Sequence, residues 1–173
     1  KVNDSKNQLQ QAESRQKLLK DMEKSFDNYN RSVKAVMNEY TNGSLKSVRL
    51  YGTVASLLSV EKEYSNAIEV SLGGSAQYIV TETEDDAKKS IEYLKRTKQG
   101  RATFLPVSAA KSSSLNEFGV EKCNGYIGIA SELVKFDKKY SNVINGLLGR
   151  VVVVDTIDNA INIDILLTLP SVI

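Results

Sequence analysis

Apolar positions in residues 1–42 recur at alternating steps of four and three. This spacing forms a narrow stripe along one side of a helix, and the segment contains no Gly or Pro to interrupt it. A helix of about 40 residues would be roughly 60 Å long, which exceeds the width expected for the rest of the chain. The pattern therefore predicts a coiled-coil arm helix over 1–44 that stops near Gly43 and pairs with a helix outside this chain. The apolar positions are Met22, Phe26, Tyr29, Val33, Val36 and Tyr40.

From residue 45 to residue 163, helical periods alternate with short apolar runs. Helices are expected at about 61–72, 84–99 and 137–147 and after Thr156, and strands at about 76–82, 101–107 and 151–155. The last strand, VVVVD, is expected to be buried on both faces. This alternation predicts a mixed α/β fold.

The chain contains an internal repeat. YSNAIEVSLG at 64–73 is written again as YSNVINGLLG at 140–149, and each copy is followed by an apolar strand, a Thr and an acidic turn. The repeat predicts two related α/β subdomains, at about 48–107 and 120–163, within one domain spanning 45–163. The apolar residues 164–173 form an atypical tail after it.

Composition narrows the range of functions. The 173 residues are 41% apolar, which is enough for a core, and the net charge is only +2. A single cysteine, Cys123, and the absence of His exclude Cys/His zinc sites and imidazole-based triads in this segment. No run approaches the roughly 20 apolar residues of a membrane span, and the polar N-terminus is unlike a signal peptide. We therefore expect a cytoplasmic chain without membrane contact, excised from a longer protein because it begins with Lys1.

Two polar clusters are candidates for chemistry. Glu84, Asp85 and Asp86 form a carboxylate cluster that would suit Mg²⁺ or Ca²⁺ in a small α/β enzyme or ligand-binding domain, although acidic residues are also common in the first turn of a helix. The second cluster is basic, and it suits either a solvated face or the contacts of a DNA backbone. Its residues are Lys95, Arg96, Lys98 and Arg101, with Lys46 and Arg49 near the end of the predicted arm.

No P-loop pattern is present, so this segment is not expected to hydrolyse ATP by that route, and it has no predicted catalytic, cofactor or metal residues. The Gly73-Gly74 pair in SLGGSAQ follows a predicted helix. Its backbone amides therefore face away from a helix-terminal phosphate site.

Several motifs in order carry a resemblance to a known family. They are YGTVASLL, AIEVSLGGSAQYIVTETEDDAKKSIEYLKRTKQGRATFLP, GYIGIASELV and LLGRVVVVDTIDNAI. Over about residues 48–163 the chain resembles the hinge domain of structural maintenance of chromosomes (SMC) proteins, in its bacterial form.

The resemblance implies a module for chromosome condensation and segregation that forms a homodimer at the end of a coiled-coil arm. It implies DNA contact through basic residues at the junction of hinge and arm. It also implies ATPase heads elsewhere in the protein, which hold ATP and Mg²⁺, and a protein that is associated with the nucleoid. Gly73, Gly74, Gly146 and Gly149 become candidates for dimer-interface or structural glycines.

After Ile163 the sequence departs from the family. The family continues with a helix, a strand, a glycine-rich stretch of the dimer interface and a returning arm, whereas this chain reads DILLTLPSVI. The returning arm is therefore missing from this chain, and the resemblance alone does not establish that it forms a dimer.

Overall fold

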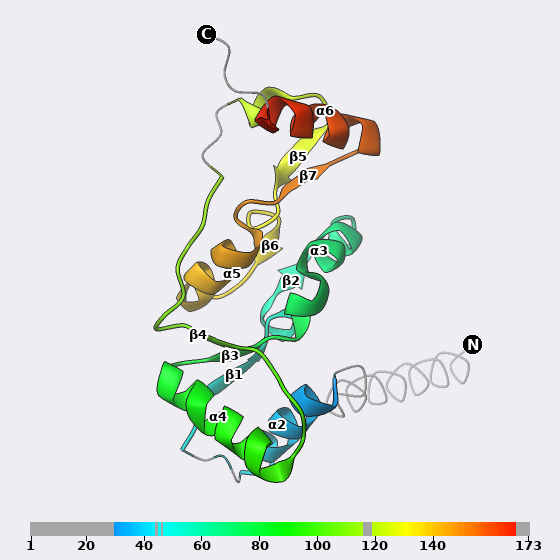
Figure 1. The fold of residues 1–173 in the computed structure, drawn as a ribbon. Coiled ribbons are helices and arrows are strands. Elements are labelled where there is room, and N and C mark those ends of the chain that lie inside the picture. The colour runs from blue at the N-terminus through cyan, green and yellow to red at the C-terminus, as the bar shows by residue number, and fades with distance from the viewer. Residues whose placement is uncertain (1–29, 44, 46, 116–118, 169–173) are drawn as a thin grey trace, which may run out of the picture.

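The computed structural model describes residues 30–43, 45, 47–115 and 119–168 of the chain. Helices and strands alternate through these ranges and form two groups stacked end to end (Figure 1). The predicted mixture of helices and strands is confirmed, although the observed strands are shorter than the predicted ones. The helices are α2 (Arg31–Thr41), α3 (Ser65–Leu72), α4 (Glu84–Thr97), α5 (Ser141–Leu148) and α6 (Ile157–Thr168), with short 3-10 turns η1 (Ala55–Leu57), η2 (Gly73–Gln77), η3 (Val120–Lys122) and η4 (Lys138–Tyr140).

The first group is built on a three-stranded sheet of order β1-β3-β4. Strand β1 (Leu50–Thr53) pairs antiparallel with β3 (Ile79–Thr81), which pairs parallel with β4 (Phe104–Pro106). Helices α2 and α4 lie together at this end of the molecule (Figure 1). They cover the sheet through one apolar cluster, whose buried members are Val33, Val36, Met37, Leu45, Val48, Leu50, Ile79 and Leu94.

The second group repeats the antiparallel strand pair of the first group but adds no third strand within the described residues. Strand β5 (Tyr126–Ile129) pairs antiparallel with β7 (Val152–Val154), and α6 lies at the opposite end of the molecule from α4 (Figure 1). The two antiparallel pairs share an irregularity, since the register shifts before Gly52 in β1 and before Gly128 in β5. Between the groups, β2 (Ser59–Val60) pairs antiparallel with β6 (Val134–Lys135), and α3 contacts α5.

A second apolar cluster crosses between the two halves. It combines residues of the first half, such as Val54 and Ile68, with residues of the second half, such as Tyr140 and Ile144. The two decapeptide copies thus form helices that share one core. The predicted subdomain boundaries, 48–107 and 120–163, stay a prediction, because this core belongs to both halves.

The arm prediction is wrong at Asn30. A single helix over 1–44 requires helical backbone there, but Asn30 has φ −55° and ψ 146°, and α2 begins at Arg31. Of the stripe residues that the structure describes, Val33 and Val36 are buried in the cluster shared with α4 and the sheet, whereas Tyr40 is 37% exposed. The partner helix outside this chain stays a prediction. The stop is as predicted, since α2 ends at Thr41 and Gly43 has φ 81°. Residues 22, 26 and 29 of the stripe lie outside the described residues, as do 169–173 of the tail.

The expectation for VVVVD is also wrong. Val153 is buried, but Val152 and Val154 are only half-buried. The physical reason is topological. Within the described residues β7 has a strand on one side only, whereas β3, its counterpart in the first half, lies between two strands and is buried at all three positions.

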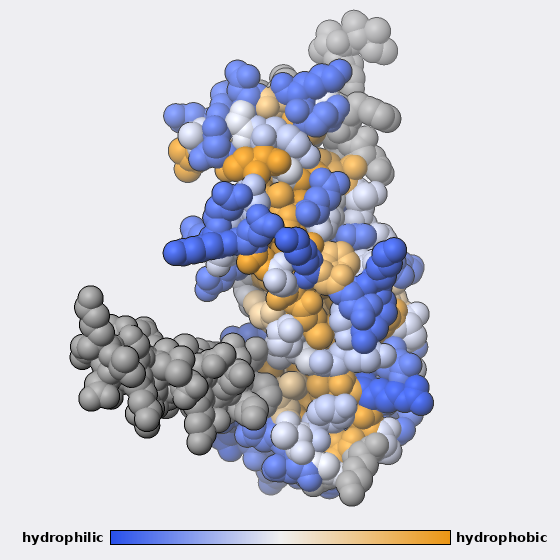
Figure 2. All heavy atoms as spheres, turned by 180° about the vertical axis from the view of Figure 1, so that it is seen from behind, coloured by the Kyte–Doolittle hydropathy of each residue, from blue (hydrophilic) through white to orange (hydrophobic). Residues whose placement is uncertain are grey.

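Apolar surface is not confined to the two cores. On the face opposite to that of Figure 1, hydrophobic residues form a band along the molecule with hydrophilic residues on either side (Figure 2). The most exposed large apolar side chains are Val70 on α3 and Ile157 and Ile161 on α6, at 74%, 76% and 53%. Within the described ranges, none of the helices combines the length and apolar content that crossing a bilayer requires.

Candidate functional site

The carboxylate cluster is built into the start of α4. Asp86 is only 6% exposed, and its carboxylate accepts hydrogen bonds from the Thr83 hydroxyl (2.6 Å), the Thr83 N–H (3.1 Å) and the Arg49 N–H (3.0 Å). The Asp86 N–H in turn donates to the Thr83 hydroxyl at 3.2 Å, which completes a capping box. Burial alone would raise the pKa of Asp86. The hydrogen bonds from Thr83 and from the two backbone N–H groups outweigh burial and hold the pKa below its usual value.

The two other carboxylates of the cluster are exposed, and Asp85 pairs with Lys89 one turn along the helix at 2.7 Å. Across the described part of the chain, no group of three His, Cys, Asp or Glu residues is arranged to hold a metal ion. Glu84, Asp85 and Asp86 therefore form the acidic first turn of a helix. Nothing in this geometry supports an enzyme or ligand-binding domain built on them.

Gly146 and Gly149 make close contacts inside the chain. The connection that follows β4 passes along α5, and the Leu115 N–H donates to the Gly149 carbonyl at 2.9 Å. A Cβ atom at Gly146 would lie 2.8 Å from the Lys111 carbonyl oxygen, and one at Gly149 would overlap the Ser113 carbonyl oxygen. These two glycines thus let the backbone of the connection pack against α5.

Gly73 and Gly74 have a different environment. Both are exposed at the end of α3, and a Cβ atom built on either would meet no atom within 4 Å. Gly73 also has φ 47°, a conformation that favours glycine. Of the four glycine candidates, this pair leaves room for contact with another molecule.

The basic cluster is only partly brought together. Lys95 and Arg96 lie in the last turn of α4, and Lys98 and Arg101 follow it, all four exposed. Arg49 instead donates to Glu82 at 2.6 Å, and this hydrogen bond raises the pKa of Arg49 and offsets its charge. Lys46 lies outside the described residues.

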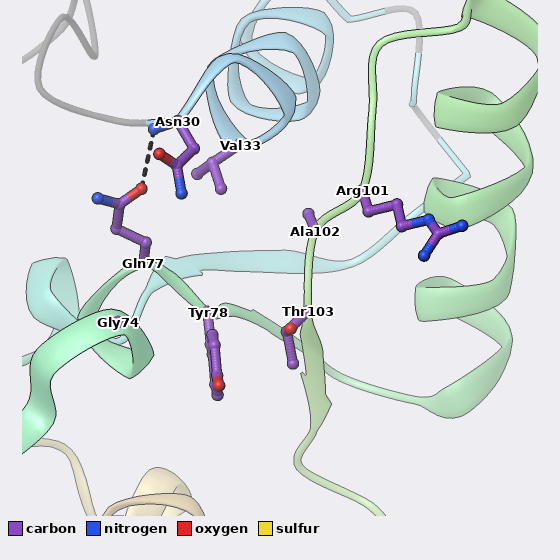
Figure 3. A pocket seen from close by; sticks show the side chains of 8 residues that line it. All are labelled: Asn30, Val33, Gly74, Gln77, Tyr78, Arg101, Ala102 and Thr103. Carbon is purple, nitrogen blue, oxygen red and sulfur yellow. Dashed lines mark hydrogen bonds between the residues drawn. The ribbon is translucent and has the colours of Figure 1, made fainter.

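A set of contacts between α2 and distant parts of the chain was not predicted from the sequence. The Asn30 N–H donates to Gln77 Oε1 at 2.8 Å, Arg31 Nε donates to Gln99 Oε1 at 3.1 Å, and the Ser32 hydroxyl donates to the Arg101 carbonyl at 2.6 Å. Figure 3 shows Gln77 reaching from η2 to the first residue before α2, beside a pocket of about 320 Å³. No local pattern marks such contacts, because the partners are separated by 47 to 69 positions. The pocket is lined by Asn30, Val33, Gly74, Gln77, Tyr78, Arg101, Ala102 and Thr103.

Polar and aromatic contacts also join the two halves. The Lys139 ammonium lies 4.7 Å from the ring centre of Tyr51 in β1 and 4.8 Å from that of Tyr140 before α5. The two rings meet edge to face at 5.3 Å. Lys135 of β6 pairs with Glu61, just after β2, at 2.9 Å.

Comparison with known proteins identifies this arrangement. The family described as "SMC proteins Flexible Hinge Domain" matches residues 47–164. The chain is 40% identical over 155 residues to the chromosome partition protein Smc of Clostridium kluyveri and 39% identical to that of Bacillus subtilis, and these matches cover 87% and 88% of the chain. The chain spans 13% of the length of each of these relatives.

Solved structures agree with the sequence matches. A structure described as an asymmetric dimer of the Geobacillus stearothermophilus SMC hinge domain superposes with a TM-score of 0.83 at 32% identity, over 95% of this chain and 65% of that one. The Pyrococcus furiosus SMC hinge domain gives 0.59 at 33% identity, over 75% of this chain and 73% of that one. The resemblance predicted from the sequence motifs is thereby confirmed, and the chain belongs to the family of SMC flexible hinge domains.

Proposed function

We propose that this chain is a joining module that links two copies of a chromosome partition protein through its hinge. The observation that carries the proposal is the match over 95% of the chain to a hinge domain solved as an asymmetric dimer. The domain family is structural and not catalytic, which agrees with the purely structural use of Asp86 at the start of α4.

The end of α3 is our candidate for part of the surface that a second copy covers. Gly73 and Gly74 are open there, and Val70, on the same helix, is 74% exposed. The buried core of a protein interface is more apolar than the rest of the surface, and an exposed Val70 beside accessible backbone fits such a core. The glycines allow another chain to approach this backbone closely.

Sedimentation equilibrium tests the proposal on the 173-residue chain and on a version ending at Ile163. A discrete dimer is expected in both, which would show that residues 164–173 are not needed for the interface. Gly74→Arg should shift the equilibrium to monomer, because a Cβ atom at Gly74 meets no atom of its own chain within 4 Å and the long side chain beyond it would obstruct a second copy. Asn66→Arg, at the exposed other end of α3, is the matched control and should leave the dimer intact.

A chain that stays monomeric in sedimentation equilibrium at high protein concentration would contradict the joining function. A dimer that Gly74→Arg leaves unchanged would keep the function but remove the end of α3 from the interface.

DNA contact is a second, separate proposal. It is supported by Lys95, Arg96, Lys98 and Arg101, which are exposed and make no ion pair with a described residue. Changing all four to Glu should abolish a salt-sensitive mobility shift of duplex DNA. Single changes should each reduce the slope of log affinity against log salt by about 0.9, because one phosphate is no longer neutralised. A shift that survives the fourfold change would exclude this patch.

The role of the whole protein is proposed by way of its relatives. The matched chromosome partition proteins are about seven times as long as the chain, so ATP and Mg²⁺ binding would belong to head domains outside it. We place the complete protein in the cytoplasm at the nucleoid, with a returning arm supplied from elsewhere in its sequence.

A further inference from the structure

A groove of about 560 Å³ lies between the second half of α4 and the segment that follows this helix. Its floor is apolar: Leu94 is buried, Ala102 is half-buried and packs on the same core, and Ile91 remains 38% exposed. The groove is lined by Ile91, Leu94, Lys95, Lys98, Gly100, Arg101 and Ala102.

Three cations surround this floor. Lys95, Lys98 and Arg101 are exposed and form no ion pair within the described part of the chain, whereas Lys89 on the same helix is paired with Asp85. Arg101 also borders the pocket beside Gln77. However, Figure 3 shows its side chain directed toward α4 and away from Gln77 and Tyr78. All three charges therefore lie around the groove without an anion among the described residues.

The backbone at one of these cations is unusual. Lys98 has φ 53° and is the one non-glycine residue with positive φ in the ranges that the structure describes. It occupies the position after α4 where glycine normally ends a helix, and its N–H group bonds back to the carbonyls of Leu94 and Lys95. A residue held in a sparsely populated conformation is a reason to look for a function of its side chain.

We propose that this groove binds an acidic segment of a partner protein, which inserts one large apolar side chain against Ile91 and Leu94. The carboxylates of the segment would meet Lys95, Lys98 and Arg101, so that charge complementarity selects the partner and the apolar floor anchors it. A phosphate backbone would use the cations alone and leave Ile91 without a role. This inference is independent of the joining of two copies, and it shares three cations with the DNA proposal.

Fluorescence anisotropy tests the proposal on the full 173-residue chain. The probe is a labelled short peptide with one central phenylalanine flanked on both sides by aspartate and glutamate. A second peptide, with serine in place of the phenylalanine, carries the same charge. The phenylalanine peptide should bind at least about fivefold more tightly than the serine peptide.

Two variants separate the contribution of the cations to peptide binding from that of the apolar floor of the groove. Lys98→Gly removes one cation and places glycine where φ is positive, so its fold is retained, and it should weaken binding of both peptides. Ile91→Ser should remove the preference for phenylalanine. Lys62→Ala, an exposed charge on another surface, is the control and should bind like the unchanged chain.

Equal binding of the two peptides would overturn the proposal, as would an Ile91→Ser variant that still prefers phenylalanine. If neither peptide binds, and duplex DNA binds equally well to the unchanged chain and to Ile91→Ser, the groove would be assigned to nucleic acid instead. Loss of self-association by Gly74→Arg should leave peptide binding unchanged, so the two proposals can fail separately.

Discussion

At the scale of single residues, Asp86 connects the start of α4 to the entry of β1. Its carboxylate completes the capping box with the N-cap residue Thr83 and accepts from the Arg49 N–H just before β1. Asp86→Ala should lower the free energy of unfolding by about 1–3 kcal/mol, because the capping box is lost and two partly buried N–H groups lose their acceptor. Asp85→Ala, on the exposed side of the same turn, should change it by less than about 0.5 kcal/mol. Urea unfolding of both variants measures the difference.

The same carboxylate predicts a pH dependence. Because the pKa of Asp86 is lowered in the folded chain, its stabilising effect is present above its unfolded pKa of about 3.9 and is lost as the pH falls through the folded value. The stability advantage of the unchanged chain over Asp86→Asn should therefore shrink between about pH 5 and pH 2. A constant difference over that range would show that the carboxylate charge contributes nothing.

Gly149 should tolerate no side chain. Gly149→Ala places a Cβ atom on the Ser113 carbonyl oxygen and should destabilise the chain by about 1–3 kcal/mol, because the connection must move away from α5. Gly74→Ala is the matched control, since the space around Gly74 is open and its stability should not decrease. Thermal unfolding followed by circular dichroism compares them. Equal melting temperatures for the two variants would mean that the connection does not pack as closely as the structure shows.

At the scale of elements, local chemistry predicts where helices begin and end but not what they pack against. Thr83 and the acids after it indicated the start of α4, and Gly43 indicated the end of α2, because caps and glycine stops act within a few residues. The apolar stripe predicted the face of α2 that is buried at Val33 and Val36, but not that this face packs on α4 and the sheet of the same chain. Spacing along one helix carries no information about a partner that is distant in the sequence, and the contacts of Gln77 and Gln99 were missed for the same reason.

For the candidate site too, the sequence predicted local runs of residues but not the contacts between distant ones. The basic residues were found as a run along the sequence, but the groove depends on Ala102 and Arg101 folding back beside α4. The repeat indicated that the two decapeptides are equivalent. It did not show that Gly146 and Gly149 contact the connection while Gly73, at the place of Gly149 in the other copy, stays open.

Strands β3 and β7 occupy equivalent places in the two copies and should differ in stability. Strand β3 is buried and paired on both sides, whereas β7 is paired with β5 alone in the described structure. Amide hydrogen exchange measured by mass spectrometry should therefore be slower over Ile79–Thr81 than over Val152–Val154. Equal protection in a chain shown to be monomeric would mean that the second edge of β7 is covered. Slower exchange of β7 on dimerisation would place that edge near the interface.

At the scale of the whole molecule, the core shared by the two halves predicts that they unfold together. Tryptophan reporters at Phe104, beside the α2–α4 core, and at Phe136, beside the shared core, should give coincident urea transitions. Ile144→Ala removes a fully buried side chain of the shared core and should lower the free energy of unfolding by about 2–5 kcal/mol. Both reporters should record the same decrease, although Phe104 packs on the other cluster. Two separate transitions, or an effect of Ile144→Ala on the Phe136 reporter alone, would show that the halves are independent subdomains. Joint unfolding is expected because any separation of the two halves would have to expose the apolar core that they share.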